Sequence, residues 1–72
     1  MNNRKPKYKP ATKFIHYMAE NEITYRKVAE ITGYRPETVS NWVKGKTTFP
    51  YDAMYRISNY YKKTLDELFG NT

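Results

Sequence analysis

The residues best suited to contact another molecule lie between Thr24 and Pro50, in two short amphipathic segments separated by a tight turn. The turn covers residues 33–36, Gly-Tyr-Arg-Pro, and Gly45 ends the second segment. Glycine at such positions permits the left-handed backbone that closes a helix. The spacing therefore predicts a helix-turn-helix, in which the polar face of the second helix can lie in a DNA major groove.

Positive charge is concentrated at the N-terminus. The first thirteen residues contain five cations and no acidic residue, whereas the rest of the chain carries eight basic and seven acidic residues. The five cations are Arg4, Lys5, Lys7, Lys9 and Lys13. Proline and asparagine around them disfavour a helix, so residues 1–10 are expected to form a mobile basic arm. Such an arm attracts DNA phosphates or enters a minor groove. A solubilising tail and attraction to an anionic partner protein are the alternatives.

Length and composition disfavour several classes of function. The 72 residues contain no cysteine, and His16 has no second histidine with which to share a metal site. No apolar run approaches the roughly 18 residues that span a bilayer, and the N-terminus is too polar for a secretory signal. A cytoplasmic protein is therefore expected. Because no nucleophile has a positioned base and no glycine-rich phosphate loop is present, no enzyme, cofactor or small-molecule ligand is expected. No signature of an RNA-binding module is found.

Helical periodicity and capping residues predict five short helices and no strand. The expected ranges are 11–21, 24–33, 36–44, 50–61 and 64–69. Thr64 and Glu67 form a capping-box pattern, in which each side chain accepts a backbone N–H at the start of the last helix. We therefore expect an all-α, compact five-helix bundle over residues 11–72.

The apolar positions of these helices predict a single core. Those expected to point inward are Phe14, Ile15 and Met18; Val28 and Ala29 with Ile31 or Thr32; Val39, Trp42 and Val43; Ala53, Met54, Ile57 and Tyr61; and Leu65, Leu68 and Phe69. The chain also carries eight tyrosines, of which helical phasing is expected to bury about half. Tyr25 and Tyr34, beside the turn, are expected to stay at least partly exposed, where tyrosine suits a protein interface.

The residues from about Thr12 to Phe69 resemble the Cro/CI-type (XRE-like) helix-turn-helix family of phage and bacterial regulators. The matching positions are Val28-Ala29-Glu30, Gly33, Thr38-Val39-Ser40-Asn41-Trp42, Gly45-Lys46, Pro50 and Thr64-Leu65-Asp66-Glu67-Leu68. The resemblance implies a bundle of the lambda-repressor-like type and a regulator that binds double-stranded operator DNA through its third helix.

The resemblance also implies roles for particular residues. The positions that read bases or contact a partner are Tyr25, Tyr34, Arg35, Pro36, Glu37, Thr38, Asn41 and Lys44. Phosphate contacts are implied for Thr24, Arg26, Lys46 and Thr47, and the basic arm adds Arg4, Lys5, Lys7 and Lys9. Arg35 suits a bidentate contact to guanine, and Asn41 suits one to adenine. Tyr25 stands where the family commonly has glutamine, so its hydroxyl can donate but the paired groups of an amide are lost.

Three residues depart from the family pattern. Pro36 has no polar side chain with which to read a base. Glu37 places a carboxylate at the closest approach to DNA, where it can accept from a cytosine amino group but repels phosphates. The same carboxylate is also favourable near the positive end of the helix dipole. Val43 replaces an acidic residue common at its position, and it is expected either to extend the core or to add an apolar edge to the contact surface.

Two functions follow from the resemblance. The first is a sequence-specific regulator of a phage lysis–lysogeny switch that binds operator DNA, with a homodimer expected. The second is an antirepressor, or modulator of repression, that forms a complex with the cognate CI-type repressor. Its contact surface would consist of Tyr25, Tyr34, Arg35, Pro36, Glu37 and Val43. In the second case Glu37 pairs with the basic DNA-binding face of the repressor.

Overall fold

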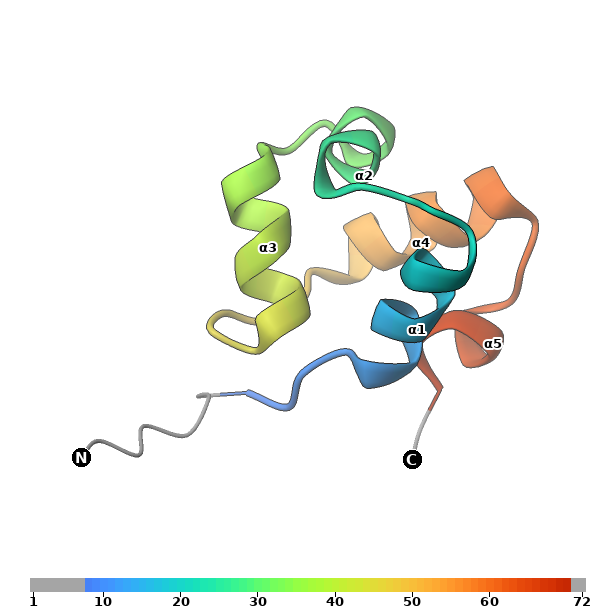
Figure 1. The fold of residues 1–72 in the computed structure, drawn as a ribbon, viewed down its shortest axis with the longest axis horizontal. Coiled ribbons are helices and arrows are strands. Elements are labelled where there is room, and N and C mark those ends of the chain that lie inside the picture. Colours follow the sequence, from blue (N-terminus) through green and yellow to red (C-terminus); the bar gives the residue numbers. More distant parts are fainter. Residues whose placement is uncertain (1–7, 71–72) are drawn as a thin grey trace.

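The structure, a computed structural model, describes residues 8–70 and contains five helices in this range (Figure 1). They are α1 (Thr12–Glu20), α2 (Tyr25–Thr32), α3 (Pro36–Lys44), α4 (Tyr51–Tyr61) and α5 (Leu65–Phe69). None of the residues from 8 to 70 lies in a strand. Helix α2 packs against α3 and α4, while α5 closes the bundle against α1 and α4. The predicted all-α five-helix bundle is confirmed, and each predicted range agrees with its helix to within one residue at either end.

Local sequence sets the ends of the helices that form the helix-turn-helix. The Lys27 amide donates to Thr24 Oγ1 (3.0 Å), which satisfies one of the unpaired N–H groups at the start of α2. Gly33 and Gly45 follow α2 and α3 in the left-handed conformation, with φ values of 85° and 84°. Pro36 occupies the first position of α3, where the missing N–H of proline removes no helical hydrogen bond.

Helix α5 begins with the predicted capping box. The Glu67 amide donates to Thr64 Oγ1 (3.0 Å), and the Thr64 amide donates to the Glu67 carboxylate (2.8 Å). This bond from the Thr64 amide stabilises the charged carboxylate, so it lowers the pKa of Glu67 below its ordinary value of 4.5.

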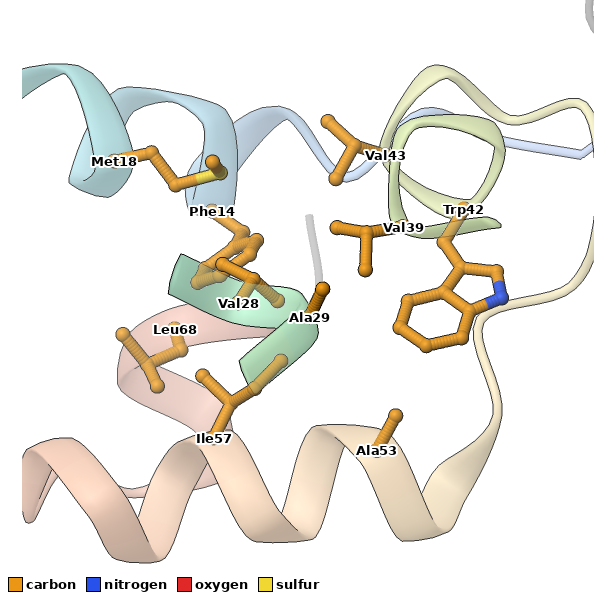
Figure 2. Packing of buried hydrophobic residues seen from close by; sticks show 10 residues of the cluster. All are labelled: Phe14, Met18, Val28, Ala29, Val39, Trp42, Val43, Ala53, Ile57 and Leu68. Atoms are coloured by element: carbon orange, nitrogen blue, oxygen red, sulfur yellow. The ribbon is translucent and has the colours of Figure 1, made fainter. Parts of the chain in front are cut away.

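Side chains from all five helices meet in one core (Figure 2). The buried apolar residues are Phe14, Met18, Val28, Ala29, Val39, Trp42, Val43, Ala53, Ile57 and Leu68. Phe14 packs against the rings of Phe49 and Phe69, with centroid distances of 6.1 Å and 5.0 Å. Phe49 was not predicted as a core residue, although it packs against Phe69 and Trp42 as well, at 5.0 Å from each. The core therefore depends on an aromatic residue from the loop between α3 and α4.

The prediction that Ile15 points into the core is wrong. Its side chain is 38% exposed, because it borders an open groove of about 300 Å³ that no helix covers. Four other predicted core residues are only half-buried: Met54, Tyr61, Leu65 and Phe69. The sequence left open whether Ile31 or Thr32 of α2 is buried. Thr32 is the buried residue, and its hydroxyl donates to the Val28 carbonyl (2.9 Å). Ile31 is half-buried.

The prediction that about half of the tyrosines are buried is also wrong. All eight lie within the described residues, and none of them is buried. Three are half-buried and five are exposed, because most of them lie on the outward sides of α1 and α4 or beside the turn. Small aliphatic residues and phenylalanine fill the core instead.

Replacement of Gly33 tests the turn between α2 and α3. Gly33→Ala is expected to lower the free energy of unfolding by about 1–2 kcal/mol, because alanine is strained at a left-handed φ. No atom lies within 4 Å of the position that the added Cβ would occupy, so the cost is in the backbone alone. Urea unfolding followed by circular dichroism measures it, with Gly33→Asn as the control, since asparagine tolerates this conformation better. Equal losses for both variants would contradict this explanation.

The capping box predicts a pH dependence of stability. Because the pKa of Glu67 is lower in the folded protein than its ordinary 4.5, its contribution is present above about pH 4.5. The contribution is lost as the pH falls through the folded pKa. The difference in unfolding free energy between the wild type and Glu67→Gln should therefore be largest near neutral pH and shrink in acid. A difference that stays constant across that range would show that the carboxylate charge is not involved.

Candidate nucleic-acid interface

The outward face of α3 combines a polar ridge with a buried apolar side. Glu37, Asn41 and Lys44 follow one another at i, i+4 and i+7, a spacing that places them on one face of a helix. Glu37 and Lys44 are exposed, and Asn41 is half-buried. The opposite side, formed by Val39, Trp42 and Val43, points into the core in Figure 2. Helix α3 therefore presents a polar surface of about two turns to whatever it contacts.

Further predicted contact residues continue this surface at both ends of α3. Tyr34, Arg35 and Pro36, before and at the start of the helix, are exposed, and Thr38 is half-buried. After the helix, Lys46 and Thr47 are exposed, and their amides both donate to the Asn41 carbonyl (2.9 Å and 3.4 Å). Ser40 is half-buried and lies three residues after Glu37 on the ridge. Sequence reasoning did not select it as a contact residue, although the i, i+3 spacing from Glu37 indicates the same face.

The start of α2 lies close to the second half of α3. Thr24, Tyr25 and Val43 line the same apolar groove that Ile15 borders. The hydroxyl of Thr24 accepts from the Lys27 amide as the helix cap, which leaves its own proton available to donate to a phosphate oxygen. Arg26 is exposed, and Tyr25 is half-buried. The fold thus brings the first residues of α2 near the Val43 end of α3.

A ring contact and a hydrogen bond, both made by Tyr34, hold the turn before α3 in place. Tyr34 lies against Trp42 edge to face, with 4.7 Å between the ring centroids. Its hydroxyl donates to the Asp52 carboxylate at the start of α4 (3.2 Å). Burial of the phenol raises the pKa of Tyr34 above its ordinary value of 10.0, and the bond to Asp52 adds to the shift, so the hydroxyl stays a donor at neutral pH. Tyr34 therefore fixes the turn, and its hydroxyl is already engaged within the protein.

Val43 belongs to the core. Its side chain is 1% exposed, so the expectation that it adds an apolar edge to a contact surface is wrong, and the alternative that it extends the core is confirmed. Residues just before α1 lie along this end of α3: the Tyr8 amide donates to the Gly45 carbonyl (2.7 Å), and the Ala11 amide donates to the Val43 carbonyl (3.1 Å). We call residues 8–11 the strap. It pairs two carbonyls at the C-terminal end of α3.

The strap includes the last residues of the predicted basic arm. Residues 8–10, the last part of that arm, contact the domain through the Tyr8 amide, and Lys9 is exposed. Arg4, Lys5 and Lys7 lie outside the described residues. The boundary at residue 10 stays a prediction, but the point at which the chain reaches the domain is the C-terminal end of α3, beside Lys44 and Lys46.

Comparison with known protein families agrees with this geometry. A family model described as Helix-turn-helix matches residues 16–68. The chain belongs to the Cro/CI-type (XRE-like) helix-turn-helix family. Neither the comparison with curated proteins nor the comparison with solved structures gives a significant match.

Membership of this family defines the general function. The protein is a DNA-binding helix-turn-helix regulator of transcription, since this is a family of DNA-binding regulators and not of enzymes. Among residues 8–70, no helix has the length and apolar character needed to cross a bilayer. The same residues contain no group of histidine, cysteine and acidic side chains able to hold a metal ion.

Substitution of Val43 tests the role of the strap. Val43→Glu buries a charge at the residue whose carbonyl accepts from the Ala11 amide of the strap. We expect the strap to detach, so the Tyr8 and Ala11 amides should lose their protection from hydrogen exchange. Val43→Ala is the control, because it shortens the side chain without adding a charge. Retained protection of both amides in Val43→Glu would contradict the proposed coupling between this side chain and the strap.

Proposed function

We propose that this regulator controls a phage lysis–lysogeny switch in the bacterial cytoplasm by placing α3 in the major groove of operator DNA. The observation that supports this proposal is the exposed ridge of α3, with Asn41 at its centre and Lys44 at its end. The opposite side of the helix is anchored by Trp42 in the core, so the ridge is held rigidly toward its target.

Each exposed group along α3 has a defined chemistry in a major groove. The Arg35 guanidinium matches the two acceptors of guanine, and the Asn41 amide matches the donor and acceptor of adenine. Glu37 can accept only from an amino group, such as that of cytosine, which favours a C·G pair opposite the first turn. Lys44, Lys46 and Thr47 then provide phosphate contacts at the other end of the helix, and these fix the position of the protein on the duplex.

Phosphate contacts at the start of α2 complete this arrangement. Thr24 lines the groove that Ile15 and Val43 border, and Arg26 is exposed two residues later. The cations that contact phosphates at α2 and α3 supply affinity for any DNA sequence. Arg35 and Asn41 supply the preference for one sequence. This division of roles allows the two contributions to be measured separately.

The variant Arg35→Ala/Asn41→Ala is expected to lose sequence discrimination while keeping affinity for unrelated DNA. Each lost bidentate contact should weaken binding to the preferred sequence by roughly 5- to 150-fold. Fluorescence anisotropy with a duplex from the region upstream of its own gene, and with a scrambled duplex, measures both affinities.

Lys46→Ala is the matched control. It should weaken binding to both duplexes and make the slope of log K against log salt about 1 unit shallower. If the Arg35→Ala/Asn41→Ala variant still prefers the upstream sequence, the assignment of the base-reading residues is wrong.

A second candidate function is the antirepressor, and the carboxylate of Glu37 favours it. Glu37 is exposed on the ridge, and within residues 8–70 it forms no ion pair. A free anion at the closest approach to DNA is unfavourable for a phosphate-bound complex and favourable for a complex with the basic face of a repressor. The contact surface would then comprise Tyr25, Tyr34, Arg35, Pro36 and Glu37, without Val43.

Size-exclusion chromatography with the purified cognate CI-type repressor tests this alternative. Complex formation at micromolar concentration is expected, weakened by Glu37→Lys and less affected by Glu37→Gln, because reversal of the charge adds repulsion. Failure of the wild-type proteins to co-migrate would exclude the antirepressor function. Because the anisotropy assay contains no repressor, the outcomes of the two experiments are independent.

A further inference from the structure

A cavity of about 250 Å³ lies where the strap crosses from α3 to the start of α1 (Figure 1). Residues of the strap, of four helices and of the loop after α3 line it. Of the described residues assigned to DNA contacts, only Lys9 and Thr47 belong to this lining. We call this space the strap cavity. Its other residues have no role in the function assigned to α3.

Aromatic side chains form the apolar part of the strap cavity. Trp42, Phe49 and Phe69 all line it. The Phe49 ring centroid lies 5.0 Å from that of Trp42 and 5.0 Å from that of Phe69, so the three rings form one continuous surface. Phe49 and Phe69 are only half-buried, which leaves part of each ring open to a ligand. Aromatic rings pack favourably on such a surface, both stacked and edge to face.

The polar part of the strap cavity is positively charged. Lys9 and Lys13 line it together with Thr12 and Thr47, and no acidic side chain from residues 8–70 does so. The Lys13 ammonium donates to the Asp66 carbonyl (3.1 Å), and it forms no ion pair with any other residue in this range. This bond orients the ammonium, and its other two protons remain for an anion. The cavity therefore suits a negative group attached to an apolar body.

We propose that the strap cavity binds a small aromatic carboxylate, with its ring on Phe49 and Phe69 and its carboxylate at Lys13. A cavity of about 150 Å³ holds benzene, so one of about 250 Å³ has space for a ring and a carboxylate. A long fatty acid exceeds this volume, and an inorganic anion leaves the rings uncovered. Residue types alone did not indicate such a ligand, because these side chains come together only in the folded bundle. The proposal goes beyond DNA binding and requires no DNA.

Ligand binding should hold the strap against the domain. Tyr8 and Ala11 line the cavity, and their amides donate to carbonyls at the end of α3. Exchange of both amides with solvent requires these bonds to open. A ligand that binds only the closed arrangement slows this exchange by a factor of one plus the ratio of ligand concentration to Kd, which is about 11-fold at ten times Kd. Hydrogen exchange of the two amides therefore reports binding independently of chemical shifts.

An NMR titration of the ¹⁵N-labelled wild type with benzoate, without DNA, tests the proposal. A ligand this small should bind with a Kd of roughly 1 mM. Saturable shift changes are expected at the indole N–H of Trp42, the only tryptophan of the chain, and at the amides of residues 11–13 and 69–70. Benzamide has the same shape without the charge, and cyclohexanecarboxylate has the charge without the aromatic ring. Each should bind several-fold more weakly than benzoate.

Substitutions of lysine identify the group that holds the carboxylate. Lys13→Met should weaken benzoate binding about two- to fivefold and leave benzamide binding unchanged, whereas Lys13→Arg should bind benzoate like the wild type. Lys63→Met is the matched control, because it removes an exposed charge that does not line the cavity.

Three results would each overturn the proposal: no saturable shifts at the cavity, equal affinities of the wild type for benzoate and benzamide, or unchanged exchange of the Tyr8 and Ala11 amides at saturating benzoate. All three are measured on the wild type, so they stand even if Lys13→Met fails to fold. Since no DNA is present, they are also independent of the function proposed for α3.

Discussion

The packing of Trp42 is the interaction on which the presentation of α3 depends. The indole lies against Phe49 at 5.0 Å and against Tyr34 at 4.7 Å, so it joins the loop after α3 to the turn before it. Phe49 in turn contacts Phe14 and Phe69, which carries the connection to α1 and α5. A polar ridge on a short helix has no stability of its own, because isolated helices of this length are marginal in water. The aromatic cluster holds α3 in a fixed orientation with its polar side outward.

The C-terminal end of α3 is stabilised from a different direction. Helix ends leave several carbonyls without intrahelical partners. Here the Tyr8 amide donates to the Gly45 carbonyl, and the Ala11 amide donates to the Val43 carbonyl. The amides of Lys46 and Thr47 both donate to the Asn41 carbonyl. The strap therefore stabilises the end of α3 through its backbone, while the buried Val43 side chain fixes the same end through the core.

Local signals made most of the fold predictable, and tertiary contacts account for what was missed. The capping box at Thr64 and the left-handed Gly33 depend on neighbours within four residues, so the sequence alone reveals them. The exposure of Ile15 depends on which helix happens to cover α1, and no local pattern encodes that.

In the candidate site, too, some features follow from local sequence and others depend on tertiary contacts. The outward positions of α3 follow from helical spacing around Val39, Trp42 and Val43, and they were predicted correctly as a face. The bond between Tyr34 and Asp52 joins residues 18 apart in the sequence, and it appears only when α4 returns beside the turn. A prediction from residue types therefore treats Tyr34 as a free contact residue, although its hydroxyl already donates to the Asp52 carboxylate.

The central claim is that the outward side of α3 is the surface through which this regulator meets its target. An NMR titration of the ¹⁵N-labelled protein with the DNA duplex from upstream of its gene tests it most directly. The account predicts that amide shifts change most from Arg35 to Thr47 and at Thr24–Arg26, while those of α5 stay constant. Shift changes that instead cluster on α5, with α3 unaffected, would contradict it.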